Sequence, residues 1–135
     1  MNEEHLVPLS NQSLKILERL QPLTGKSEFI FQSERSRKKP ISENTMSKAL
    51  HILGYKGKAT PHGFRATASS MLNEAQFNAD AIEKQLSHSD RDQVRSSYTH
   101  HASFLDQRTR MMQWWADKLD DASSNWAKNI EKLAC

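Results

Sequence analysis

The sequence predicts a mainly α-helical fold with one or two short β-strands near the N-terminus. Apolar residues recur every three or four positions over most of the chain, whereas β-prone runs are short and occur only before residue 32. Proline, glycine and capping residues separate successive segments. At 135 residues, of which 36% are hydrophobic, the chain is one domain, or a large piece of one, with a small helical core.

Six segments have the apolar spacing of helices. They span about residues 11–21, 45–53, 62–74, 80–86, 90–98 and 104–119, and the periodicity is weakest in 90–98. The expected organisation is a domain over residues 1–119, followed by a C-terminal tail or helix over residues 120–135. In the long segment 104–119, Trp114 and Trp115 are expected to pack in the core, the alternative being docking against another protomer.

Capping and breaking residues mark the ends of these helices. The residues that fit by type and place are Pro22 and Gly25 after the first helix, Ser42 before the second and Gly54 after it, Thr60 and Pro61 before the third, and Asn78 before the fourth. Two β-prone runs, 5–9 and 29–31, are the expected strands, and Pro8 suits an edge strand.

A cluster of basic residues follows the second β-prone run. It lies in a stretch, 33–40, that reads as a loop, and its members are Arg35, Arg37, Lys38 and Lys39. Such a cluster is either a solvated loop or a contact with DNA phosphates, which basic side chains bind without regard to sequence. The net charge of +3 and the isoelectric point near 9.1 are compatible with nucleic acid without requiring it.

Composition excludes several other classes. The one cysteine, Cys135, cannot form an internal disulfide and indicates a reducing cytoplasm. No stretch approaches the roughly 20 apolar residues of a membrane span, and no apolar signal segment follows Met1. Six histidines occur without the His-Glu-x-x-His pattern, so we expect no metal site.

The segment from Thr60 to Thr67 carries a possible phosphate clamp. His62 and Arg65 are three positions apart at the start of a predicted helix, and residues at this spacing share a face. A helix N-terminus favours an anion, and an arginine can bind two phosphate oxygens at once. Further along, His88 lies in a polar break between helices, and Tyr98 follows ten positions later. Taken singly, each of these residues also fits a structural role, as a helix cap, a surface side chain or a packed side chain.

Taken together, the order His-x-x-Arg, Leu-x-His and Tyr resembles the tyrosine recombinases, most closely the integrases of temperate phages and genomic islands. The likeness extends over about residues 6–119 and includes the stretch from Arg110 to Asp117. It implies that residues 1–119 are the C-terminal part of that family's helical catalytic domain, and it implies site-specific DNA recombination. In that reaction Tyr98 attacks a phosphate to give a 3′-phosphotyrosyl intermediate, while Arg65, His62 and His88 stabilise the phosphate and assist proton transfer.

The resemblance also implies the partners. These are double-stranded DNA at attachment sites and other protomers, which act as a tetramer and can exchange a C-terminal segment such as residues 120–135. Neither a metal nor another cofactor is implied, and the basic cluster is expected to contact DNA near the cleavage site. The family uses an additional arginine and a lysine that lie before the strand similar to residues 6–9. Because this chain offers no counterpart there, we expect the isolated chain to be weak or inactive.

Three other functions fit parts of the sequence. A non-catalytic DNA-binding remnant would explain the absent arginine and lysine, and a type IB topoisomerase would share the chemistry of Tyr98. A helical protein-interaction module has only the tryptophans in its favour. The resemblance in residues 60–67 and 114–117 favours the integrase.

Overall fold

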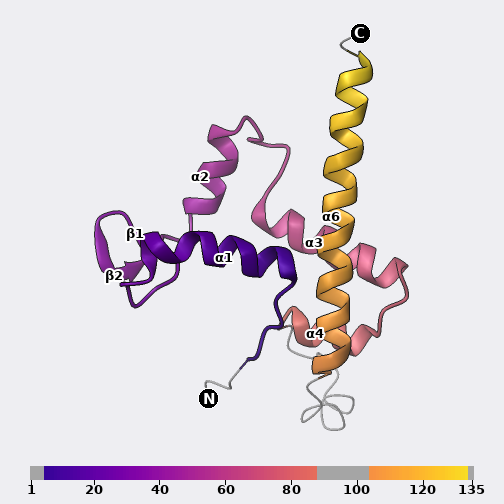
Figure 1. Ribbon diagram of the computed structural model, residues 1–135, viewed down its shortest axis with the longest axis horizontal. Helices are drawn as coiled ribbons and strands as arrows, with labels where there is room; N and C mark the ends of the chain where they lie inside the picture. The colour runs from indigo at the N-terminus through magenta and orange to yellow at the C-terminus, as the bar shows by residue number, and fades with distance from the viewer. Residues whose placement is uncertain (1–4, 88–103, 134–135) are drawn as a thin grey trace. The chain divides into compact units, whose positions relative to one another are not determined.

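Figure 1 shows a computed structural model of the chain, which describes residues 5–87 and 104–133, with the side chains of 5–87 and 104–127. The elements are α1 (Asn11–Thr24), β1 (Gln32–Ser33), β2 (Ser36–Pro40), α2 (Thr45–Ile52), α3 (Pro61–Glu74), α4 (Ala79–Gln85) and α6 (Leu105–Leu133). The prediction of a mainly helical fold with short strands near the N-terminus is confirmed. The helix predicted over 90–98 lies outside the described residues.

The chain forms two compact units. One consists of Met1–Gln12 together with Ser70–Cys135, and the other of Ser13–Ser69. The helix α3 begins in the second unit and ends in the first. Among the side chains that the structure describes, the buried ones all belong to the first unit. None of the described helices is long and apolar enough to cross a membrane.

Helix α1 extends beyond its predicted end. Pro22 was expected to close the helix, but it lies inside the last turn, and the helix ends at Thr24. A proline removes one backbone N–H donor from the helix, and the helix nevertheless continues for two more residues, where the Thr24 hydroxyl donates to the Leu20 carbonyl at 3.4 Å. The amide of Gly25 donates to the Gln21 carbonyl at 2.7 Å, so Gly25 follows the helix as predicted.

The basic stretch forms a β-hairpin, so the prediction of a loop over residues 33–40 was wrong. Strands β1 and β2 pair antiparallel with an irregular register. The amide of Ile41 donates to the Phe31 carbonyl at 2.9 Å, and the Ser27 hydroxyl donates to the Arg37 carbonyl at 2.7 Å. These partners come from other segments, and a propensity argument on the basic residues alone does not include them.

The two β-prone runs are not strands at the predicted positions. Strand β1 begins at Gln32, just after the second run, 29–31. Residues 5–10 have no regular secondary structure. A strand needs a backbone partner, and the carbonyl of Leu6 instead accepts a hydrogen bond from the guanidinium of Arg108.

Helix α2 begins at a different cap from the predicted one. Its N-cap residue is Asn44, which makes no side-chain capping bond, while the Ser42 hydroxyl lies 3.1 Å from that of Thr45. The predicted end is confirmed, because Gly54 follows the helix with φ +84°. The amides of Gly54 and Tyr55 donate back to the His51 and Leu50 carbonyls, the pattern that closes many helices at a glycine.

The core lies between the end of α3, α4 and the first half of α6, and α4 runs beside α6 in Figure 1. Leu72, Ile82 and Met111 are at most 2% exposed and form its centre. The partly buried residues around them are Phe77, Leu86, Met112, Trp114 and Trp115. The prediction that the two tryptophans pack in the core is confirmed.

Candidate active site

The N-terminus of α3 is built as the sequence predicts. Pro61 is the first helical residue, and the Thr60 hydroxyl accepts a hydrogen bond from the Gly63 amide at 2.9 Å. This bond satisfies one of the amides that a helix leaves without an internal partner. An added Cβ at Gly63 would lie 3.2 Å from the same hydroxyl, so glycine allows the capping residue to approach closely.

His62 and Arg65 lie in the first two turns of α3, three positions apart. The His62 side chain is exposed and that of Arg65 is half-buried. The first turn of α3 carries no acidic residue, so the positive end of the helix dipole and the Arg65 guanidinium act in the same sense. This end of α3 can therefore accept an anion, as a phosphate-binding site requires.

Two of the predicted catalytic residues, His88 and Tyr98, lie outside the described residues. The chain is described up to Ser87, just after α4, and again from Phe104, just before α6. The roles assigned to all four residues thus stay predictions.

The predicted DNA-binding residues lie on the hairpin. Arg35 is in the turn, and Arg37, Lys38 and Lys39 follow on β2. All four side chains are exposed, and none forms an ion pair with another residue in the described part of the chain. Since successive strand residues point to opposite faces, Arg37 and Lys39 share one face. Exposed positive charge of this kind attracts a polyanion.

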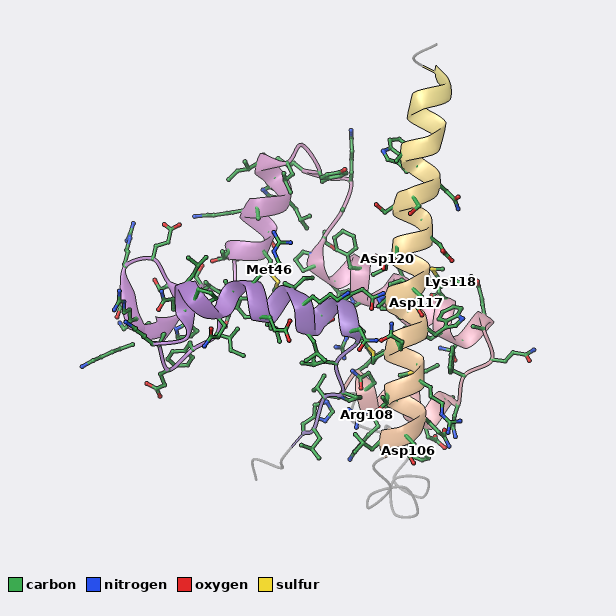
Figure 2. The ribbon with its side chains drawn as sticks, viewed as in Figure 1. Met46, Asp106, Arg108, Asp117, Lys118 and Asp120 are labelled. Atoms are coloured by element: carbon green, nitrogen blue, oxygen red, sulfur yellow. The ribbon has the colours of Figure 1, made fainter. Side chains whose placement is uncertain are left out.

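Arg108 is an unexpected feature of the first turns of α6. Its side chain is only 1% exposed. Figure 2 labels Arg108 near the start of α6. Its Nε donates to Gln85 Oε1 at 2.8 Å, and its Nη2 donates to the Leu6 carbonyl. Burial lowers the pKa of the Arg108 guanidinium, which nevertheless remains charged in any protein environment. The sequence contains a signal for this burial. Arg108 lies three and four positions before Met111 and Met112, which places it on the apolar face of α6.

A polar network joins the start of α1 to the middle of α6. Gln12 Nε2 donates to carboxylate oxygens of both Asp117 and Asp120 at 2.9 Å. Gln113 donates to Gln12 Oε1 at 2.9 Å and to Asp117 at 2.8 Å, and its own oxygen accepts from the Asn11 amide. The bonds from Gln12 and Gln113 hold the pKa of the Asp117 carboxyl below its ordinary value. Among the described residues, no group of three His, Cys, Asp or Glu side chains could hold a metal ion.

Comparison with known proteins gives the class of this chain. The model of the phage integrase family matches residues 1–103. The chain is 46% identical over 123 residues to an integrase of Enterobacteria phage P4, covering 89% of this chain and 28% of that protein. It is 45% identical over 118 residues to an integrase of Shigella phage Sf6, covering 87% of this chain and 30% of that protein.

A bacterial relative has the same degree of similarity. The prophage integrase IntA of Escherichia coli K12 is 44% identical over 124 residues, covering 92% of this chain and 30% of that protein. No solved structure matches the chain. The chain belongs to the phage integrase family, and it spans less than a third of the length of these curated relatives.

Proposed function

We propose that the protein carrying this chain is a site-specific DNA recombinase that cuts and rejoins DNA through a phosphotyrosyl intermediate. The observation that supports this most strongly is family membership over residues 1–103, together with the retention of all four side chains that the reaction would use. These are His62, Arg65, His88 and Tyr98.

In the proposed reaction the Tyr98 oxygen attacks a DNA phosphorus in line with the 5′-oxygen. The new bond joins the tyrosine to the 3′-phosphate, and the broken bond releases a 5′-hydroxyl that takes up a proton. A 5′-hydroxyl from a second strand then reverses the step. Because the phosphotyrosyl ester replaces one phosphodiester bond with another, no external energy source is needed.

The other three side chains stabilise the charge that develops on the phosphate. Arg65 binds the non-bridging oxygens with its planar group, and His88 donates a hydrogen bond to one of them. His62 contacts the phosphate from the exposed first turn of α3 and helps to remove the tyrosine proton. The capped, acid-free N-terminus of α3 supports this arrangement, since it favours an anion beside His62 and Arg65.

DNA binding outside the reaction centre is assigned to the hairpin. The exposed side chains of Arg35, Arg37, Lys38 and Lys39 bind phosphates near the cleavage site. The partners are double-stranded DNA at attachment sites and further protomers, which assemble as a tetramer in the bacterial cytoplasm. The segment 120–135 is the part exchanged between protomers. Its support is that α6 continues to Leu133 and that the side chains of 117–127 are exposed.

A nicked DNA that traps the covalent adduct tests the assignment of the nucleophile. In the full-length protein, Tyr98→Phe is expected to abolish the adduct while DNA affinity changes little. The chain has one other tyrosine, the exposed Tyr55, so Tyr55→Phe is a matched control that should form adduct at the wild-type rate. Arg65→Ala is expected to remove cleavage as well. A Tyr98→Phe protein that still forms adduct would assign the nucleophile to another residue, and a wild-type protein that binds DNA without adduct would indicate a non-catalytic remnant.

A further inference from the structure

Arg108 connects two segments that lie close in sequence to the proposed catalytic residues. Its partner Gln85 is the last residue of α4 and comes three positions before His88. Arg108 itself is in the first turns of α6, ten positions after Tyr98. A single side chain thus links the helix that precedes His88 to the helix that follows Tyr98.

A guanidinium is an unfavourable choice for this position on packing grounds alone. The core of this unit is centred on the apolar residues Leu72, Ile82 and Met111, and a charge that is buried loses its hydration. A methionine would fill a similar volume without that loss. Unlike methionine, arginine forms hydrogen bonds in defined directions, because its donors have fixed positions in one plane. Nε binds Gln85 and Nη2 binds the Leu6 carbonyl, so these two contacts fix the orientation of α4 and the N-terminal segment about α6.

The backbone at both helix ends is also constrained. Ser87, just after α4, has φ +51°, and Phe104, just before α6, has φ +48°. Residues with a side chain rarely adopt these values, so surrounding contacts must hold them. The Ser87 amide donates to the Lys84 carbonyl at 3.2 Å, and the Phe104 carbonyl accepts from the Arg108 amide at 2.8 Å. Arg108 therefore holds one of these two ends through its backbone and the other through Gln85.

We propose that Arg108 is a positioning residue for strand cleavage. By fixing the end of α4 against the start of α6, it restrains the two ends, at Ser87 and Phe104, between which the sequence carries His88 and Tyr98. The inference rests on the proposed function of these two residues, and it assigns Arg108 no contact with DNA. Loss of the constraint would slow the chemical step rather than weaken DNA binding, because a displacement of about 1 Å at a reacting group can reduce a rate about 100-fold.

The test uses Arg108→Met in the full-length protein, with single-turnover adduct formation at saturating nicked DNA. We expect the adduct rate to fall by about 10- to 100-fold, with a DNA dissociation constant within about 3-fold of wild type. Arg108→Lys keeps the charge without the fork and should lose part of the rate. Arg110→Met removes an exposed arginine two positions away and should retain the full rate.

Two further variants separate positioning from general stability. Leu72→Ala damages the same core without touching the Arg108 hydrogen bonds, and it should cleave at nearly the wild-type rate wherever it remains folded. If Arg108→Met does not fold, Gln85→Met removes the acceptor alone and should reduce the adduct rate in the same direction. The inference is overturned if Arg108→Met and Gln85→Met form adduct as fast as the Leu72→Ala protein. In that event an inactive Tyr98→Phe protein would leave the proposed function intact, whereas an active one would overturn that function too.

Discussion

The ring of Phe77 lies edge-on to the ring of Trp114, with centroids 5.3 Å apart and planes at 64°. Phe77 follows the C-terminus of α3, and Trp114 lies on α6, so the pair connects two elements of the core. The ammonium of Lys118 lies 5.6 Å from the centroid of the same Trp114 ring. Both contacts use the polarity of aromatic rings, whose faces are negative and whose edges are positive.

Trp114→Ala is expected to lower the free energy of unfolding by about 3 kcal/mol, since the change removes a large packed side chain. A double-mutant cycle with Phe77→Ala should give a coupling energy of about 0.5–1.5 kcal/mol, as measured by urea unfolding. Trp126→Ala is the control, because this tryptophan is 68% exposed and its loss should have a small effect. Equal losses at positions 114 and 126 would contradict the packing described for Trp114.

The end of α3 offers a stabilising substitution. Gln76 adopts φ +60°, and its amide and that of Phe77 donate to the Asn73 and Leu72 carbonyls. A left-handed conformation is unfavourable for any residue with a side chain, so Gln76→Gly should raise the free energy of unfolding by about 1 kcal/mol. Glu74→Gly, inside the helix two positions earlier, should instead lower it by about 0.5–1 kcal/mol. Thermal unfolding of both variants measures the difference, and a destabilised Gln76→Gly protein would contradict this geometry.

The Asp117 carboxylate makes part of the stability dependent on pH. Hydrogen bonds from Gln12 and Gln113 lower its pKa in the folded protein. A carboxyl whose folded pKa is depressed stabilises the fold above its unfolded pKa, and this stabilisation is lost as the pH falls through the folded value. Asp117→Asn should therefore lower the melting temperature at pH 7, and the difference from wild type should begin to shrink near pH 4 and be lost as the pH falls through the lower folded pKa.

Removing the first of the two donors provides the control for this pH effect. Gln12→Met eliminates the bonds to Asp117 and Asp120. In that background Asp117→Asn should change the melting temperature at pH 7 by less than it does in the wild type. A change of the same size in both backgrounds would show that the Gln12 bond is not the cause.

The hairpin predicts a salt-dependent contribution to DNA binding. Arg37→Ala and Lys39→Ala each remove an exposed positive charge from β2, and each should weaken binding to all DNA sequences alike. If each side chain neutralises one phosphate, the slope of log affinity against log salt should fall by about 1 per substitution. Lys15→Ala, on the exposed surface of α1, should leave the slope unchanged. Slopes equal to that of the wild type would place the hairpin away from the DNA.

The features that could be predicted from the sequence depend on neighbouring residues. The Thr60 cap, the Asn78 cap and the Gly54 terminus each involve bonds that span five residues or fewer, and each lies where the sequence places it. The same is true of the pair His62 and Arg65, whose shared face follows from helical spacing alone.

The features that could not be predicted depend on distant partners. The hairpin needs the pairing of β1 with β2, and the apparent strand at residues 5–9 is absent because the Leu6 carbonyl binds a side chain 102 positions away. Burial of Arg108 likewise follows from packing against α4 rather than from its residue type, which is ordinarily exposed. The predicted end of α1, just before Pro22, and the observed end, at Thr24, differ by about one helical turn, and local sequence alone does not fix a helix end more closely than this.

The length of α6 has a thermodynamic consequence for its second half. Its 29 residues correspond to roughly 44 Å of helix. Of its side chains described, up to Ala127, the buried ones are Arg108, Met111 and Ala116, and every one from Asp117 to Ala127 is exposed. The first half of α6 is held in helical form by the core. The exposed second half therefore extends an existing helix and avoids the unfavourable step of forming a first helical turn. Its helicity should therefore decline gradually from the free end on warming, as in a helix–coil transition, before the cooperative unfolding of the rest.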